Sequence, residues 1–137
     1  MAWREEDPAA TIEGDVVELT VPAEPAYLAV VRTATAGLAA RLRFSTEEIE
    51  DLRAAVDEAC ALLLGLPTVT EEPALTCRFD LHDDGLTVVV AAPAAPGAQL
   101  PSTSFAWQVL TAYASDVSGS ARNGTATIAL TKHRSRR

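Results

Sequence analysis

The stretch Asp51–Leu62, which reads DLRAAVDEACAL, decides the fold of this chain. Its apolar residues recur at intervals of three and four, which is the spacing of one buried face of an α-helix. Upstream of it, Ser45 is followed three residues later by Glu48, the pattern of a capping box in which each side chain satisfies a backbone N–H group at a helix start. The pattern predicts a helix from Ser45 to Gly65 that carries the acidic pair Asp57-Glu58 in its second half.

Strands and further helices are predicted on both sides of this helix. Residues 86–92 are almost continuously apolar, which indicates a central strand of a sheet. The dipeptide Asp84-Gly85 is expected to supply the positive φ angles of the hairpin turn before it. The remaining predicted elements are a strand at 15–21, a helix from Pro25 to Phe44, a strand at 75–81, a helix from Ser102 or Ser104 to about Ala112, and a hairpin of 116–118 and 125–132 joined through Asn123-Gly124. This order predicts an α/β two-layer sandwich, with a mixed, mostly antiparallel sheet covered on one face by three helices.

Length and composition indicate one domain, because 137 residues with 48% hydrophobic content suffice for a single core. We expect a disordered segment at 1–14, the domain at 15–132 and a solvated basic tail at 133–137. The charge of −8 argues against direct binding of nucleic acid. No stretch is apolar for long enough to cross a membrane, and a cytoplasmic location is expected. Cys60 and Cys77 are expected in the core, and no pattern of metal ligands is present.

The order of elements, with the acidic pair late in the second helix, resembles the GHKL ATPase superfamily, whose fold is Bergerat-like. Within it, the chain is similar to the anti-sigma factor and serine-protein kinase family of the RsbW and SpoIIAB type. The stretches that carry the resemblance are Val21–Leu28, Asp51–Cys60 and Gly124–Lys132. Residues Ser104–Ala112 are similar to an actinobacterial branch, the mycobacterial and streptomycete antagonists of stress and developmental sigma factors.

The resemblance implies a pair of catalytic residues on the second helix. In such kinases a glutamate polarises the attacking hydroxyl, and an asparagine four residues later holds the magnesium ion, because i and i+4 side chains share one helical face. Glu58 stands at the glutamate position, whereas Leu62 stands at the asparagine position and offers the metal no oxygen.

Two further nucleotide-binding elements of the family are also missing. The aspartate that binds the adenine amino group would fall at or near Ala92, and the stretch that follows, which includes Ala94, contains prolines in place of flexible glycines. Ser102–Phe105 occupies the place of the glycine-rich turn before the third helix. We therefore expect a degenerate serine-protein kinase without phosphoryl transfer and without a cofactor, in which Glu58 has a structural role and Asp57 is a solvated neighbour.

The resemblance also implies the partners. The family sequesters an alternative sigma factor and releases it when a STAS-domain anti-anti-sigma factor competes, and its members usually form homodimers. An arginine on the first helix contacts both partners, and Arg32 lies at the matching spacing ahead of Glu58. The alternative is an ordinary solvated arginine. Trp107 and Tyr113 are candidate aromatic anchors, with burial of at least one of them expected.

Two other functions remain open from the sequence. The first is an active or weakly active serine-protein kinase that uses Glu58, ATP and Mg²⁺ in a rebuilt pocket and phosphorylates the anti-anti-sigma factor. The second is a sensor that binds another small molecule in the degenerate pocket.

Overall fold

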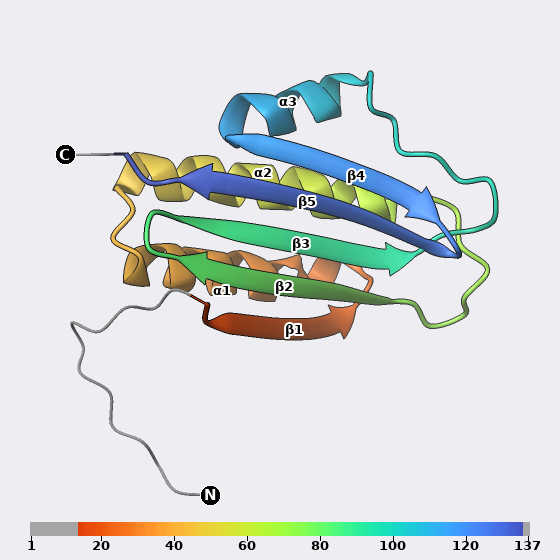
Figure 1. The fold of residues 1–137 in the computed structure, drawn as a ribbon. Helices are drawn as coiled ribbons and strands as arrows, with labels where there is room; N and C mark the ends of the chain where they lie inside the picture. Colours follow the sequence, from red (N-terminus) through yellow and green to blue (C-terminus); the bar gives the residue numbers. More distant parts are fainter. Residues whose placement is uncertain (1–13, 136–137) are drawn as a thin grey trace, which may run out of the picture.

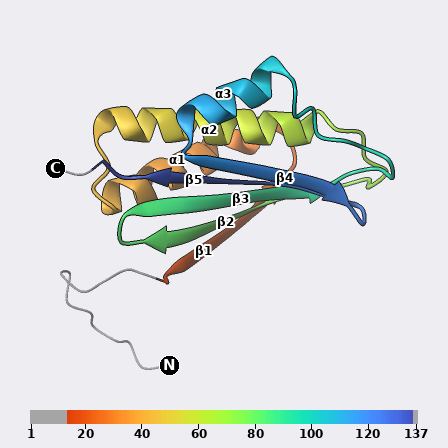
Figure 2. The ribbon, with the colours of Figure 1, turned by 45° about the horizontal axis from the view of Figure 1, so that its top comes forward.

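The computed structural model describes residues 14–135 and consists of one sheet with helices on one of its faces (Figure 1). The elements in chain order are β1 (Val16–Pro22), a 3₁₀ turn (Pro25–Tyr27), α1 (Leu28–Arg41), α2 (Thr46–Leu64), β2 (Ala74–His82), β3 (Gly85–Pro93), α3 (Phe105–Tyr113), β4 (Asp116–Arg122) and β5 (Thr125–His133). The strand order is β1-β2-β3-β5-β4, and every neighbouring pair is antiparallel. The sheet is therefore wholly antiparallel, whereas we expected a mixed, mostly antiparallel sheet. Figure 2 shows the two layers, which confirms the predicted sandwich. No helix of the described range is long and apolar enough to cross a bilayer.

The strand β3 lies at the centre of the sheet, as its apolar sequence predicts. Its residues Leu86, Val88 and Val90 are fully buried under the helices. The alternate residues, such as Thr87 and Val89, lie on the opposite face of the sheet and are half-buried, because side chains of a strand point alternately to the two faces. The core therefore lies between one face of the sheet and the helix layer.

The helix α2 begins with the predicted capping box. The Ser45 hydroxyl oxygen accepts a hydrogen bond from the Glu48 backbone N–H at 3.1 Å, and the Glu48 carboxylate accepts one from the Ser45 backbone N–H at 2.7 Å. The helix packs between α1 and α3 and buries Leu52, Val56 and Leu63. The preceding helix α1 ends at Arg41 and not at Phe44, because Arg43 adopts a φ of 64°, the left-handed conformation that stops a helix.

The two hairpin turns differ in their backbone conformation. The turn between β4 and β5 lies at Asn123-Gly124, as predicted, and both residues have a positive φ. The turn between β2 and β3 is formed by Asp83 and Asp84, and none of its residues has a positive φ, so the expected role of Asp84-Gly85 is wrong. Gly85 instead lets β3 approach β5, because a Cβ atom there would lie 2.6 Å from the carbonyl oxygen of Lys132.

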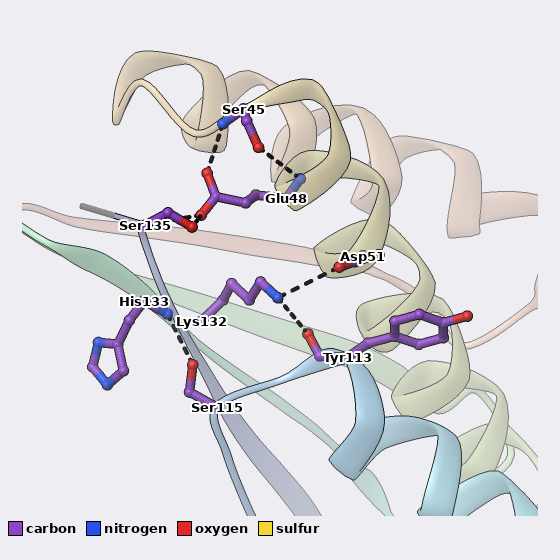
Figure 3. A network of polar contacts seen from close by, with 8 residues as sticks. All are labelled: Ser45, Glu48, Asp51, Tyr113, Ser115, Lys132, His133 and Ser135. Atoms are coloured by element: carbon purple, nitrogen blue, oxygen red, sulfur yellow. Dashed lines mark hydrogen bonds and ion pairs between the residues drawn. The ribbon is translucent and has the colours of Figure 1, made fainter. Parts of the chain in front are cut away.

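The end of the described chain is held against the start of α2 (Figure 3). The backbone N–H and the hydroxyl of Ser135 donate to the second oxygen of the Glu48 carboxylate, at 2.6 and 2.7 Å. The Arg134 guanidinium donates to the carbonyl oxygen of Leu42 at 2.8 Å. The solvated tail expected at 133–137 is therefore wrong for Arg134 and Ser135, because both bind residues that lie 87 to 92 positions earlier. The segment expected to be disordered, 1–14, lies outside the described residues except for Gly14.

A second contact of this kind involves Lys132, near the end of β5. Its ammonium group donates to the carbonyl oxygen of Tyr113 at 3.1 Å and lies 3.6 Å from the Asp51 carboxylate (Figure 3). The lysine thus connects the last turn of α3 to α2 and the sheet, and its side chain is only 17% exposed.

The two cysteines lie in the core, as predicted, and both are free. Each is 1% exposed, Cys60 on α2 and Cys77 on β2. The hydrogen bond with Cys77 and burial both raise the pKa of the Cys60 thiol above its ordinary value.

Candidate functional site

Glu58, which stands at the position of the family's catalytic glutamate, is half-buried on α2. Within residues 14–135, the Glu58 carboxylate makes no hydrogen bond or ion pair. One turn later, Leu62 is partly buried and packs against the hydrophobic core. A helical face that carries one carboxylate and a leucine supplies no second ligating side chain for a metal ion.

The two degenerate positions at the end of β3, Ala92 within the strand and Ala94 just after it, are part of the core. Ala92 is 6% exposed and Ala94 is 7% exposed, and both belong to the same cluster against which Leu62 packs. The backbone of this segment is fixed as well, since Ala94 donates to Gly124 at 3.0 Å and Ala95 donates to Pro67 at 2.8 Å. The methyl side chains of Ala92 and Ala94 offer no acceptor to an adenine amino group. The two residues therefore do not fit an adenine nucleotide held in the manner of the family.

The segment in front of α3 forms a helix cap. The Ser104 hydroxyl oxygen accepts a hydrogen bond from the Trp107 backbone N–H at 3.2 Å. A cavity of about 250 Å³ between this segment and β4 is lined by residues that include Leu100 and Trp107. Gly119, which also lines the cavity, leaves room for both side chains, because a Cβ atom there would lie 2.7 Å from Leu100 and 2.9 Å from Trp107.

The arginine predicted to contact partners is paired within the chain. The Arg32 Nε atom of α1 donates to the Asp57 carboxylate of α2 at 2.8 Å, and the two side chains are 38% and 42% exposed. Asp57 is therefore not a solvated neighbour, and Arg32 is not a lone solvated arginine. No pattern in the sequence indicates this pair, because the two residues are 25 positions apart and the pairing depends on how α1 packs against α2.

The helix α1 is apolar on its solvent side as well as on its buried side. Leu28, Val31 and Thr35 face the core, whereas Val30 is 45% exposed and Tyr27, just before the helix, is 40% exposed. The exposed residues on this side, which we call the α1 outer face, are Ala26, Ala29, Val30, Thr33, Gly37 and Ala40. The alanine-rich and valine-rich sequence of α1 was a signal for this face, because an ordinary surface helix is polar on the side away from the core.

The aromatic residues of α3 are placed differently from one another. Trp107 is partly buried against the core, as expected for at least one of the two predicted anchors, and Tyr113 is 38% exposed. Phe105, the first residue of α3, is 79% exposed and was not recognised as a candidate anchor from the sequence.

The model of the histidine kinase-like ATPase domain family matches residues 21–124. The chain is 37% identical to serine-protein kinase RsbW of Bacillus velezensis and 36% identical to that of Bacillus subtilis, in each case over 78 residues that cover 56% of this chain. The match spans 49%, about half, of the length of either relative.

A solved structure shares the fold. The crystal structure of the RsbU and RsbW domains of Rv1364c from Mycobacterium tuberculosis superposes with a TM-score of 0.70 at 16% identity, and the match covers 90% of this chain and 33% of that one. With a family model that matches residues 21–124 of the 137, the chain belongs to the histidine kinase-like ATPase domain family.

Proposed function

We propose that the chain is a cytoplasmic anti-sigma factor of a partner-switching system and that it acts without phosphoryl transfer. It sequesters an alternative sigma factor and is countered by a STAS-domain anti-anti-sigma factor. The similarity to RsbW proteins supports this class of function.

The α1 outer face is the observation that carries the proposal. A row of small and apolar residues along an exposed helix has no folding role on the solvent side, and it permits the backbone of a partner to approach closely. Arg32 lies on the flank of this face and supplies a charged group beside it. An exposed apolar surface with an arginine at its edge suits protein recognition better than it suits a small substrate.

Replacing Arg32 with alanine is expected to weaken the binding of the sigma factor about tenfold, as the loss of an interface arginine commonly does. The measurement is titration calorimetry with each purified alternative sigma factor and STAS protein encoded in the source genome. Arg41→Ala is the matched control, because Arg41 is an exposed arginine at the end of the same helix. If wild-type chain binds none of these proteins, the proposed function is wrong; if Arg32→Ala binds all of them normally, Arg32 is not part of the interface.

The absence of kinase activity is proposed from the chemistry of three positions. Leu62, Ala92 and Ala94 carry only hydrocarbon side chains, and all three pack into or against the core. Phosphoryl transfer depends on a metal ion and on donors that neutralise the phosphate charge, and these side chains provide neither. A chain of this kind would respond to a phosphorylation state of the STAS protein that another kinase sets.

Titration of the purified chain with ATP and Mg²⁺ is expected to give no saturable binding up to millimolar nucleotide. The binding is measured by calorimetry, and phosphate transfer to the STAS protein is followed with labelled ATP. Saturable binding in the micromolar range, or a phosphorylated STAS protein, would favour the active kinase instead.

We also propose that two copies of the chain bind one sigma factor, as a homodimer. Sedimentation velocity of the free chain and of its complex decides this point. A chain that stays a monomer in both states contradicts it.

A further inference from the structure

We infer that Asp57 is a positioning residue that holds the Arg32 guanidinium so that its outer nitrogens, Nη1 and Nη2, bind a carboxylate of the protein partner. The inference rests on the proposed function and adds to it the chemical group that the partner presents. It concerns a contact across two helices, which the sequence pattern did not predict.

The geometry of the pair leaves the outer nitrogens of Arg32 available. A guanidinium group has five N–H donors in a fixed plane, and Asp57 accepts from one of them, the N–H on Nε, at 2.8 Å. Among residues 14–135, no other acceptor binds the four N–H groups on Nη1 and Nη2. These two nitrogens form the end-on fork that matches the two oxygens of a carboxylate.

The pair stands on a rigid support. Arg32 follows Val31, which is 1% exposed, and Asp57 follows Val56, which is 0% exposed, so both backbones are fixed by core packing between α1 and α2. Without the bond to Asp57, the long arginine side chain would sample several rotamers and lose that freedom when a partner binds. A guanidinium that is already held in one orientation has a smaller entropic cost of binding.

A different role of Asp57 predicts the opposite effect. If Asp57 only competed with the partner for Arg32, its removal would strengthen binding. The side-on bond through Nε does not occupy the end-on fork, so a partner carboxylate can bind without displacing Asp57. Both side chains are more than one third exposed, so solvent and salt screen the repulsion between Asp57 and an incoming carboxylate.

The test is a double-mutant cycle on the sigma factor that the wild-type chain binds, with Arg32→Ala and Asp57→Ala singly and together. We expect Asp57→Ala to weaken binding about two- to fivefold, because an ion pair that is half-exposed makes only a modest contribution. In the Arg32→Ala background, Asp57→Ala is expected to have no further effect, because Asp57 acts only through Arg32. Asp57→Asn is expected to restore most of the affinity, since the amide oxygen still accepts from Nε. Glu47→Ala removes the same charge from an exposed position of α2 and is the control for net charge.

The outcomes separate this inference from the proposed function. Tighter binding by Asp57→Ala, or an equal loss in the presence and absence of Arg32, overturns the positioning role while the anti-sigma function stands. A wild-type chain that binds no sigma factor and no STAS protein overturns both. The free chain supplies an independent readout, because the Arg32 Nε–H resonance is expected to move and to exchange faster with water in Asp57→Ala, and an unchanged resonance contradicts the pairing itself.

Discussion

Replacing Ala92 with aspartate, the residue that the kinase motif requires near this position, is expected to destabilise the chain strongly. Ala92 is 6% exposed and belongs to the hydrophobic core under the helices. A carboxyl group placed there must either lose its hydration or force the surrounding packing apart. We expect the free energy of unfolding to fall by about 3 kcal/mol or more, measured by urea denaturation at pH 7.

The control is the same substitution one residue earlier. Ala91 lies on β3 as well, but its side chain is on the face of the sheet away from the helices and is half-buried. Ala91→Asp is expected to lower the free energy of unfolding by about 1 kcal/mol or less, because its main cost is the low strand propensity of aspartate. Equal effects of the two variants would mean that Ala92 borders a hydrated cleft, and the argument against a nucleotide site would lose its basis.

Protonation of Glu48 is expected to produce a large pH dependence of stability. Burial of the Glu48 carboxyl alone would raise its pKa, but hydrogen bonds from Ser45 and Ser135 outweigh burial and lower the pKa from 4.5 to about 2. A carboxyl whose pKa is lower in the folded state stabilises the fold above its unfolded pKa, and this contribution is lost as the pH falls towards the folded value. Its size, from the shift of the pKa, is roughly 3 kcal/mol.

The measurement compares Glu48→Gln with the wild-type chain across that pH window. Glutamine resembles the protonated acid, so the variant is expected to be about 3 kcal/mol less stable at pH 7. The difference is expected to narrow steadily between pH 4.5 and pH 2. Glu47→Gln, at the exposed neighbouring position, serves as the control. A gap between Glu48→Gln and wild type that does not change with pH would contradict the hydrogen-bond network of Figure 3.

Local sequence patterns were sufficient for most of the fold. The capping box of Ser45 and Glu48 and the turn at Asn123-Gly124 are signals that short stretches contain completely, and both were predicted correctly. The turn of Asp83 and Asp84 was misassigned because an Asp-Gly dipeptide is favourable for a positive φ in isolation. What Gly85 does depends on β5, which lies far away in the sequence.

The candidate site was predictable in its residues but not in its contacts. The positions of Leu62 and Ala92 followed from the family motif, whereas their packing into the core required the structure. The ion pair of Arg32 and Asp57 and the hydrogen bonds between Ser135 and Glu48 join distant segments. Such contacts are set by tertiary packing, and no periodicity along the chain encodes them.

The burial of Cys60 and Cys77 gives the native chain a built-in chemical reporter of its own opening. Both thiols are 1% exposed, so an alkylating reagent reaches them only when α2 separates from the sheet. The rate of alkylation therefore measures how often the core opens, without any label having to be introduced. Because α2 also carries Asp57, the same reaction run with and without a bound partner would report whether docking on α1 tightens the helix layer as a whole.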